Sequence, residues 1–402
     1  MSRVPLTIIG GGAAGCALAD EFSKTIDGIV LLERNVRIPG ENQSSRSSGV
    51  VHAGIYYDRR VMPRKAELCP LGNALLYREC PILGVPIRKT GKLIIIVDKL
   101  SEEYADDTHR IAKENGVPGV EKISLDRAQE LEPNVQGIGA LYIPSSGIVD
   151  TAALVKALAG RAERRGATLL RGNNVVEINP KAGYFEITTL TTGKDNPDTF
   201  KTDLIINAAG LYADEIARMV NPASPYEIVP TRGESAKFYD TRHPGIAMKG
   251  LNVYPAPYAY DNKTGERLHV PLAEANRAVA AGRAAKTVGI HLTPTFDEQG
   301  EISSTVTIGP AKTVGIGKED YHSDLKLPAY YHERIRPIFP ELRREDIELH
   351  QAGIMAVLKG YPDWVMERDP QYHGMFNLIG MDSPGMSSVF SIVRYVKRNF
   401  IK

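Results

Sequence analysis

The order of hydrophobic and polar residues over 6–34 predicts a strand, a tight turn, a helix and a second strand. Mostly apolar residues fill 6–9, glycines at 10, 12 and 15 form the pattern G-x-G-x-x-G, and a second apolar run over 29–32 ends in Glu33. The segment between them has an apolar face at helical spacing. A strand, glycine turn and helix with an acid about 20 residues further on are typical of a site for the ADP half of a dinucleotide.

Each part of this unit has an expected task. Gly10 permits the tight turn, Gly12 lets the backbone approach a pyrophosphate, and Gly15 lets the helix pack closely on the strand. The pyrophosphate is expected on the free N–H groups at the start of the helix. Glu33 is placed to accept hydrogen bonds from a ribose diol, which argues against a 2′-phosphate and hence against NADP. This pattern leaves NAD and FAD both open.

The pattern further along the chain predicts elements of the same kind. Helical spacing predicts a helix over 151–165 and another from Ala213. Apolar or alternating runs predict strands over 168–170, 174–178, 184–190, 203–210 and 375–380. A final helix is expected after Gly385, running nearly to the end of the chain.

The stretches between these elements differ in character. A strand over 92–97, helices over 101–115 and 125–131, and short alternating strands such as 234–239 and 304–308 are expected there. The segment 259–286 is polar, charged and rich in alanine, which predicts an insertion, either a surface loop or a short exposed helix.

The alternation of these two groups predicts two interleaved domains. We expect a discontinuous dinucleotide-binding domain of Rossmann type at 1–84, 146–222 and 346–402. The substrate domain, built on an antiparallel sheet, is expected at 85–145 and 223–345 and carries the insertion 259–286. The fold class is therefore α/β with an α+β second domain.

Composition narrows the class of protein. The 402 residues include 49 Lys and Arg against 48 Asp and Glu, a net charge of +1 that gives no reason to expect a nucleic-acid partner. No apolar run approaches the roughly 18 residues of a transmembrane helix. The first strand begins within six residues, so no signal peptide is expected. The 3 cysteines lack metal-ligand spacing, which predicts no metal site and a reduced, cytoplasmic protein.

A second informative stretch covers 44–57. Serines and Arg46 stand among glycines there, and their hydroxyl and guanidinium groups suit phosphate and ribityl oxygens. His52 lies in the same stretch between small and apolar residues, where it is a candidate for catalysis or substrate contact.

With these motifs in view, the chain resembles the D-amino-acid-oxidase-like superfamily of FAD oxidoreductases and, within it, the L-2-hydroxyglutarate dehydrogenase/oxidase group. The resemblance runs nearly from end to end. It rests on the blocks 48–57, 65–69, 72–77, 89–94, 147–150, 206–214, 288–293 and 381–386. It implies that the dinucleotide is FAD and not NAD.

The resemblance also implies which positions hold FAD. The residues that match are Gly10, Gly12, Ala13, Ala14, Gly15, Glu33, Arg34, Ser44, Ser45, Arg46, Ser48, Gly49, Val175, Val176, Ala208, Ala209, Gly210, Gly353, Asp382, Ser383, Pro384, Gly385, Met386 and Ser387. The last six form a loop and helix start that would face the pyrimidine side of the flavin. A helix N-terminus there would stabilise negative charge on the ring.

Catalysis and substrate binding are assigned to a smaller set. His52 is expected to act as base, because an alcohol needs one near neutral pH, and His291 to orient the substrate. The hydroxyl donors expected at the substrate are Tyr56, Tyr57 and Tyr254. The cations considered for its carboxylate are Arg232, which comes first, and Lys359, Arg88 and Lys249.

The chain departs from the group it resembles at one position. After Gly353 and Ile354 that group usually has an arginine suited to gripping a carboxylate, whereas this chain has Met355. A methionine cannot make a bidentate contact to a carboxylate. This departure and the insertion leave the expected flavin site intact and put the identity of the substrate in question.

The expected function is FAD-dependent oxidation of a small carboxylate, first an L-2-hydroxy acid such as L-2-hydroxyglutarate. The alternatives are an FAD-dependent amine or secondary amino-acid oxidase and, from another class, a non-catalytic flavin-binding protein. The electron acceptor is expected to be oxygen or a quinone. A basic, amphipathic segment over 393–402 leaves peripheral membrane contact open, and the sequence also leaves oligomer formation open.

Overall fold

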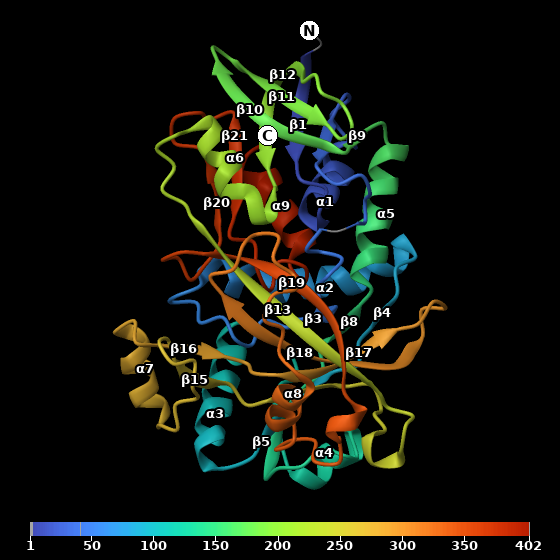
Figure 1. The fold of residues 1–402 in the computed structure, drawn as a ribbon, viewed down its shortest axis with the longest axis vertical. Helices are drawn as coiled ribbons and strands as arrows, with labels where there is room; N and C mark the ends of the chain where they lie inside the picture. The colour runs from blue at the N-terminus through green and yellow to red at the C-terminus, as the bar shows by residue number, and fades with distance from the viewer. Residues whose placement is uncertain (1–2, 41, 402) are drawn as a thin grey trace.

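The computed structural model describes residues 3–40 and 42–401, so Met1, Ser2, Glu41 and Lys402, which fall in ranges predicted for the first domain, lie outside the described residues. The chain forms two lobes stacked along the long axis of the molecule (Figure 1). Each lobe is built on its own eight-stranded sheet. The structure is thus mixed α/β, with a parallel, Rossmann-like sheet and a second, largely antiparallel one, as expected.

Parallel strands form the centre of the first sheet. Side by side lie β9 (Thr168–Arg171), β2 (Val30–Glu33), β1 (Arg3–Ile9), β12 (Asp198–Asn207) and β21 (Met375–Ile379). Antiparallel strands complete the sheet: β10 (Asn173–Lys181), β11 (Tyr184–Thr191) and β20 (Val365–Arg368). The carboxyl ends of the parallel strands therefore meet at one edge, where open α/β sheets bind ligands.

Helices cover both faces of this sheet. On one side α1 (Ala13–Phe22) packs against α5 (Thr151–Arg164) and α9 (Val389–Asn399), and α9 also packs on the long helix α2 (Pro63–Leu83). On the other side lies α6 (Ala213–Val220), whose Ile216 and Val220 join a separate buried cluster. Coverage on both faces explains why the central strands read as continuous apolar runs.

The second sheet forms the other lobe. Its strands follow the order β19 (Glu348–Leu358), β13 (Ile228–Tyr239), β18 (Ile302–Val314), β17 (His291–Phe296), β14 (Asn252–Pro255), β5 (Lys92–Ile96), β7 (Gly139–Ile143) and β6 (Glu121–Ile123). All neighbours are antiparallel except β14 and β5. The helices of this lobe are α3 (Lys99–Glu114), α4 (Leu125–Leu131) and α8 (Pro328–Ile335).

Short elements join the two lobes. A three-stranded sheet orders β3 (Val50–Val51), β8 (Gly147–Val149) and β4 (Ile87–Arg88). Single 3-10 turns occur at Gly210–Tyr212, Pro244–Ile246 and Arg344–Asp346. Because β3 directly precedes His52, this small sheet fixes the start of the segment that carries the candidate base.

The segment predicted as an insertion is more ordered than a loop. It contains β15 (Tyr258–Asp261) paired with β16 (Ala284–Thr287) and the helix α7 (Leu272–Ala280). Its Ala259 and Ala275 pack with Tyr104 of α3 in a small core of their own. The sequence pattern missed this pairing because the strands are short and the contacts that bury them come from another part of the chain.

Two elements lie differently from the simplest interpretation of the predicted ranges. Strand β19 lies within the range 346–402 assigned to the first domain, yet it pairs with β13 in the second sheet, from Ile228 opposite Leu358 to Lys237 opposite Glu348. The final helix follows Gly385 as expected, but only after a turn over 383–388, and α9 begins at Val389.

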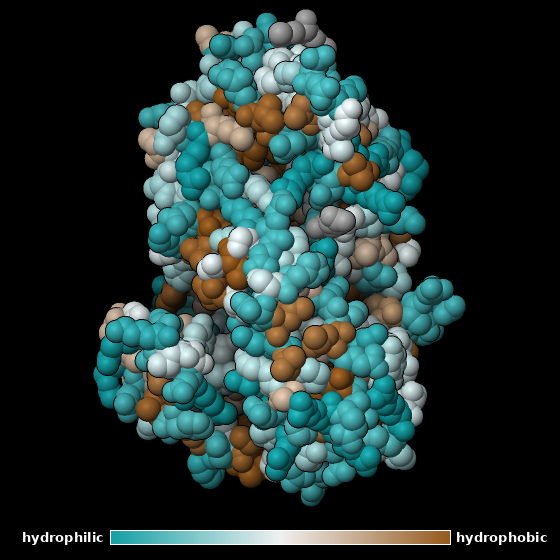
Figure 2. All heavy atoms as spheres, viewed as in Figure 1, coloured by the Kyte–Doolittle hydropathy of each residue, from teal (hydrophilic) through white to brown (hydrophobic). Residues whose placement is uncertain are grey.

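The basic C-terminal segment is tied to the protein. The apolar face of α9, including Ile392 and Val396, is buried in the core with α1, and Lys397 pairs with Glu21 at 2.7 Å. That face is therefore occupied by protein. None of the helices in the described part of the chain is long and apolar enough to cross a membrane. Figure 2 shows hydrophobic residues in separate patches on a mostly hydrophilic face.

Candidate active site

A cavity of about 720 Å³ runs from the carboxyl edge of the parallel strands to the second sheet. Its walls contain most of the residues that the resemblance assigned to FAD, together with the candidate bases. Those on the wall are Gly10, Gly12, Ala13, Ala14, Glu33, Arg34, Ser44, Arg46, Ser48, His52, Val175, Val176, Ala208, Ala209, Gly210, Tyr254, His291, Gly353, Asp382, Ser383, Pro384, Gly385, Met386 and Ser387. The structure thus brings segments far apart in the chain to the wall of one cavity.

The glycine turn after β1 leaves no room for side chains. A Cβ on Gly10 would lie 2.3 Å from the Ala208 carbonyl oxygen, and its φ of +112° disfavours any other residue. A Cβ on Gly15 would lie 1.8 Å from the Gly10 carbonyl oxygen. Gly15 is not on the cavity wall. Its missing side chain allows α1 to approach β1 so closely that the start of the helix faces the cavity.

The groups around the start of α1 are suited to a nucleotide. Gly12 precedes the helix and supplies no side-chain cap, so N–H groups of the first turn remain available to a ligand. The Ala13 N–H donates to Ser44 Oγ at 3.0 Å, which draws the serine loop to the helix start. Glu33 accepts from the Gly11 N–H at 2.6 Å and from the Asn35 N–H at 2.8 Å, and these bonds hold its carboxylate at the end of β2.

Buried donors in the serine loop have no partner among the described residues. They are Asn42 Nδ2 and Arg46 Nε. The Arg46 guanidinium also donates to the Ala352 carbonyl at 3.1 Å and lies over the Tyr321 ring at 4.3 Å. An unpaired buried donor is unfavourable unless a ligand accepts from it. This loop, the glycine turn and the helix start together fit FAD.

Two predicted cofactor residues in the serine loop lie off the wall. Ser45 donates through both its N–H and its Oγ to Asn42 Oδ1, at 3.0 and 3.2 Å, so it shapes the loop. Gly49 adopts a φ of +74°, and a Cβ there would lie 2.7 Å from the Val149 carbonyl oxygen. Both residues shape the backbone of the loop, and neither lines the cavity.

His52 lies at the far end of the cavity, beside the 383–387 turn. Its N–H donates to Ser387 Oγ at 2.8 Å, and its Nε2 lies 3.4 Å from Ser383 Oγ. Burial and the Lys92 ammonium hold the pKa of His52 well below its usual range. The imidazole is therefore neutral near pH 7 and able to accept a proton.

His291 faces the same space from β17. Its ring stacks on Tyr254, with centroids 3.8 Å apart and planes 11° from parallel. Its Nδ1 lies 3.2 Å from the Gly289 carbonyl oxygen, a bond in which the ring nitrogen must donate. Burial, reinforced by Lys92, lowers the pKa of His291 to about 3. The neutral ring therefore carries its proton on Nδ1 and presents Nε2 as an acceptor.

The 380–387 turn is anchored by α2. Lys65, buried near the start of that helix, pairs with Asp382 at 2.8 Å, and the Trp364 indole N–H donates to the same carboxylate at 3.1 Å. Gly72 lets the helix come close, since a Cβ there would lie 2.4 Å from the Ser387 carbonyl oxygen. These contacts hold the turn against His52.

Of the three tyrosines predicted to contact the substrate, one lies on the cavity wall. Tyr254 lines the cavity, whereas Tyr56 and Tyr57 do not. Burial raises the pKa of both latter phenols far above the usual range, and the Tyr56 hydroxyl has no partner among the described residues. They lie behind the wall.

Arg232, the first candidate for the substrate carboxylate, is not in the cavity. Its guanidinium is fully buried and pairs with Glu234 and Asp320, each at 3.1 Å. Side chains alternate along a strand, so Arg232 and Glu234 point to one face of β13 while Gly233 faces the cavity. The structure therefore places the Arg232 side chain away from the cavity.

The other predicted cations are also placed elsewhere. Lys359 is exposed and pairs with Glu227 at 2.8 Å. Arg88 pairs with Glu301 at 2.9 Å, and the Lys249 ammonium donates to a backbone carbonyl in α4. None of these side chains is on the cavity wall.

Several residues on the wall were not predicted as site residues, and two of them, on one strand of the second sheet, carry polar side chains. Lys312 of β18 borders the cavity, as does Thr307 on the same strand. The sequence pattern ended this strand at residue 308, whereas β18 continues to Val314. Reading alternation through the 309–314 segment could have placed Lys312 in the strand.

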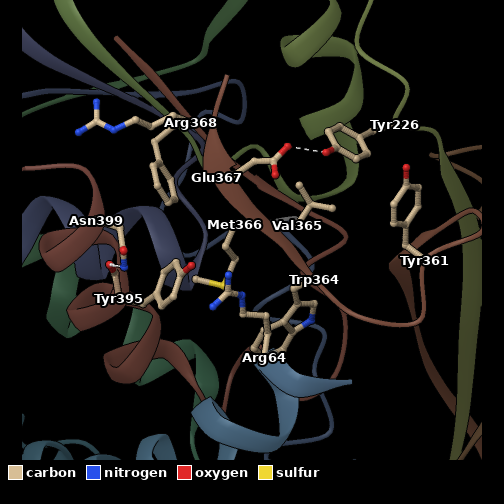
Figure 3. Close-up of a pocket in the computed structure, with 11 residues that line it drawn as sticks. Arg64, Tyr226, Tyr361, Trp364, Val365, Met366, Glu367, Arg368, Tyr395 and Asn399 are labelled. Atoms are coloured by element: carbon tan, nitrogen blue, oxygen red, sulfur yellow. Dashed lines mark hydrogen bonds between the residues drawn. The ribbon is translucent and has the colours of Figure 1, made fainter. Parts of the chain in front are cut away.

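A second, smaller pocket of about 450 Å³ lies on the outside of the first lobe, between β20 and the ends of α2 and α9 (Figure 3). Tyr226, Tyr361, Trp364 and Tyr395 contribute aromatic walls. It contains no predicted site residue. Trp364 connects it to the main cavity through the bond to Asp382.

Comparison with known proteins agrees with this geometry. The family described as "FAD dependent oxidoreductase" (DAO) matches residues 6–397. A glycerol 3-phosphate dehydrogenase of Caloramator mitchellensis is 27% identical, covering 97% of this chain and 72% of that protein. A mitochondrial L-2-hydroxyglutarate dehydrogenase of Caenorhabditis elegans is 33% identical over 64% of this chain and 58% of its own length. The FAD-bound L-alpha-glycerophosphate oxidase of Mycoplasma pneumoniae shares the fold, with a TM-score of 0.81 at 23% identity over 99% of this chain and 94% of that one.

Proposed function

Because the chain belongs to the DAO family of FAD-dependent oxidoreductases, we propose that it oxidises a small L-2-hydroxy acid, such as L-2-hydroxyglutarate, to the 2-oxo acid. FAD is the cofactor, and when bound it supplies the acceptor for the hydride from the substrate's alpha carbon. The relatives that are L-2-hydroxyglutarate dehydrogenases support this choice of substrate class.

The observation that carries the proposal is the neutral His52 on the wall of the FAD cavity. A hydroxyl group holds its proton tightly at neutral pH, so its oxidation is assisted by a base near the oxygen. His52 Nε2 is the atom that would accept this proton, and the substrate hydroxyl would take the place of its 3.4 Å contact with the Ser383 hydroxyl.

His291 would orient the substrate. Its Nε2 can accept a hydrogen bond from the substrate, while its Nδ1 is held by the Gly289 carbonyl. Stacking on Tyr254 fixes the plane of the ring, and the buried tyrosine excludes water from that side. Two neutral histidines thus face one cavity with different tasks.

An FAD-dependent amine or secondary amino-acid oxidase is the alternative. An amine only has to be neutral to be oxidised, so it gives no reason for a dedicated base. The position of His52 therefore favours a hydroxy acid. A purely flavin-binding protein would have no use for either histidine on the wall.

Anaerobic mixing tests the proposal. The FAD-loaded protein should lose its visible flavin absorbance with L-2-hydroxyglutarate and keep it with the D-enantiomer. Reduction by sarcosine and not by 2-hydroxy acids would establish the alternative. A flavin that none of these compounds reduces would contradict catalysis on either class.

A further inference from the structure

We propose that Lys312 binds the carboxylate attached to the reacting carbon of the substrate. This inference rests on the proposed function, because it names a contact for the same substrate in the same cavity. It moves the substrate-binding cation from β19, where the resemblance expected an arginine and the chain has Met355, to the neighbouring part of the sheet on β18.

Few cations are placed where they could contact a ligand in the cavity. Among the described residues, the lysines and arginines on the cavity wall are Arg34, Arg46 and Lys312. Arg34 pairs with Glu319 at 2.5 Å and lies over Tyr212, next to the nucleotide end. Arg46 belongs to the serine loop. Only Lys312 stands in the second sheet, on the side where a substrate must bind.

The sheet geometry leaves Lys312 free to reach into the cavity. Across three strands, Gly353 of β19 is paired with Gly233 of β13, and Gly233 with Lys312 of β18. Directly paired residues point to the same face, so two glycines and one lysine form a row on the cavity side. A side chain at Gly233 would crowd Pro310 at 3.2 Å and Met355 at 3.6 Å. The glycines keep the space beside the lysine open.

Met355 lies on the same face, two residues from Gly353 along β19. Its thioether carries no charge, and its terminal methyl lies close to the position a Gly233 side chain would take. The cation that the resemblance placed at 355 is thus absent, and the ammonium at 312 borders the same cavity.

The electrostatics show that Lys312 lacks a dedicated partner. Asp382 is the carboxylate that acts on the pKa of Lys312. It already pairs with Lys65 at 2.8 Å and accepts a hydrogen bond from the Trp364 indole. No ion pair of Lys312 occurs within 3–40 and 42–401. Burial lowers the pKa of Lys312, and Asp382 partly opposes that shift. Lys312 is accessible from the cavity, and an ammonium without a counter-ion there is stabilised by an anionic ligand.

The position relative to His291 fits a carboxylate on the reacting carbon. His291 of β17 is paired with Gly309 of β18, three residues before Lys312, and His291 and Lys312 both line the cavity. A substrate whose hydroxyl approaches the histidines therefore has its alpha carboxylate within the field of Lys312. A lysine offers a single point charge and not the bidentate fork of an arginine.

The test compares FAD-loaded wild type with Lys312→Met, Lys312→Arg and Lys359→Met in anaerobic rapid mixing. The Lys359→Met variant is the matched control, because that lysine is exposed and paired outside the cavity. Because Lys312→Met loses a charged hydrogen bond to the substrate, it should raise the substrate concentration that gives half-maximal flavin reduction by about 10- to 100-fold. Lys312→Arg should recover most of this loss, and Lys359→Met should match wild type.

Two substrates separate the carboxylates. L-2-Hydroxyglutarate has an alpha and a distal carboxylate, whereas L-2-hydroxyvalerate has only the alpha one. The proposal requires Lys312→Met to weaken both to a similar degree. A loss confined to L-2-hydroxyglutarate would place the ammonium on the distal carboxylate and overturn the proposal. Equal affinity of variant and wild type, or loss of bound FAD from Lys312→Met, would also overturn it.

A binding readout separates this inference from the proposed function. Glutarate is not oxidised, and its binding can be followed by the change it causes in the flavin absorbance. If no 2-hydroxy acid reduces wild type, the proposed function fails, but glutarate binding still reports on Lys312. Weaker glutarate binding by Lys312→Met, restored by Lys312→Arg, supports an anion site at this residue. Unchanged binding contradicts it.

Discussion

The His291 imidazole lies flat on the Tyr254 ring, with the two ring centroids 3.8 Å apart. The Lys92 ammonium is also 3.8 Å from the centroid of Tyr254. This arrangement couples a buried lysine to the wall of the candidate active-site cavity. It keeps His291 neutral, because a nearby positive charge and burial both disfavour a second proton on the ring.

Replacing His52 should separate chemistry from cofactor binding. His52→Ala removes the proposed base, so the rate of flavin reduction by L-2-hydroxyglutarate should fall by about 10²–10⁴-fold. FAD content, read from the ratio of visible to protein absorbance, should remain that of wild type, since the histidine side chain does not hold the nucleotide end. Near-normal reduction by His52→Ala would remove this residue from the mechanism.

The pH profile of the reduction rate follows from the same histidines. His52 and His291 both have lowered pKa values, the latter about 3, so neither gains a proton as pH falls from about 7.5 to 5.5. The kcat/KM for L-2-hydroxyglutarate should therefore show no acid limb near the ordinary histidine value of 6.5. If kcat/KM of wild type falls below about pH 6.5 and that of His52→Asn does not, His52 titrates normally and the prediction fails.

Lys92 should make stability depend on pH. Burial lowers its pKa from 10.5 to about 7, so between these values the unfolded chain binds more protons than the folded one and stability rises with pH. From pH 7 to about 8.5 the gain from this residue should be about 1–2 kcal/mol. Urea unfolding of wild type and Lys92→Met at several pH values measures this effect. The free energy of unfolding of Lys92→Met should rise less with pH than that of wild type. Identical slopes would show that Lys92 is not perturbed in the folded state.

Two helical glycines form a matched pair. Gly15→Ala places a Cβ 1.8 Å from the Gly10 carbonyl oxygen, so α1 must shift, with a loss of about 1–3 kcal/mol and of FAD content. At Gly160 in α5 the nearest atom is Arg164 Nη1 at 3.4 Å, so Gly160→Ala should stabilise the helix by about 0.5–1 kcal/mol. Thermal unfolding and flavin absorbance measure both effects. Equal behaviour of the two variants would contradict the packing role of Gly15.

The difference between these glycines explains what local sequence could reveal. Gly10, Gly12 and Gly15 lie in one continuous strand–turn–helix segment. The spacing of these glycines in the sequence therefore predicts the geometry of the turn. The parallel sheet and the two-lobe architecture followed from similar local patterns. His52 could be placed near the flavin because it belongs to a continuous block that matches the resembling family.

The substrate wall could not be read in this way. Whether Arg232 or Gly233 faces the cavity depends on the phase of β13, which is shifted by an irregularity between Glu234 and Ala236. The membership of β19 in the second sheet depends on pairing across more than a hundred residues, from Ile228 to Leu358. Alternation could extend β18 past Ile308 to Lys312, but it does not show that this strand borders the cavity. Register and long-range pairing decide these positions, and neither is written in a local pattern.

The most direct test of the account is a single-turnover measurement with FAD-loaded protein and L-2-hydroxyglutarate in the absence of oxygen. Reduced flavin and the 2-oxo acid are quantified in the same sample. The account predicts that both appear together, one molecule of 2-oxoglutarate for each FAD reduced, and that His52→Ala slows both. Flavin that stays oxidised with L-2-hydroxy acids, or is reduced by sarcosine alone, would contradict it.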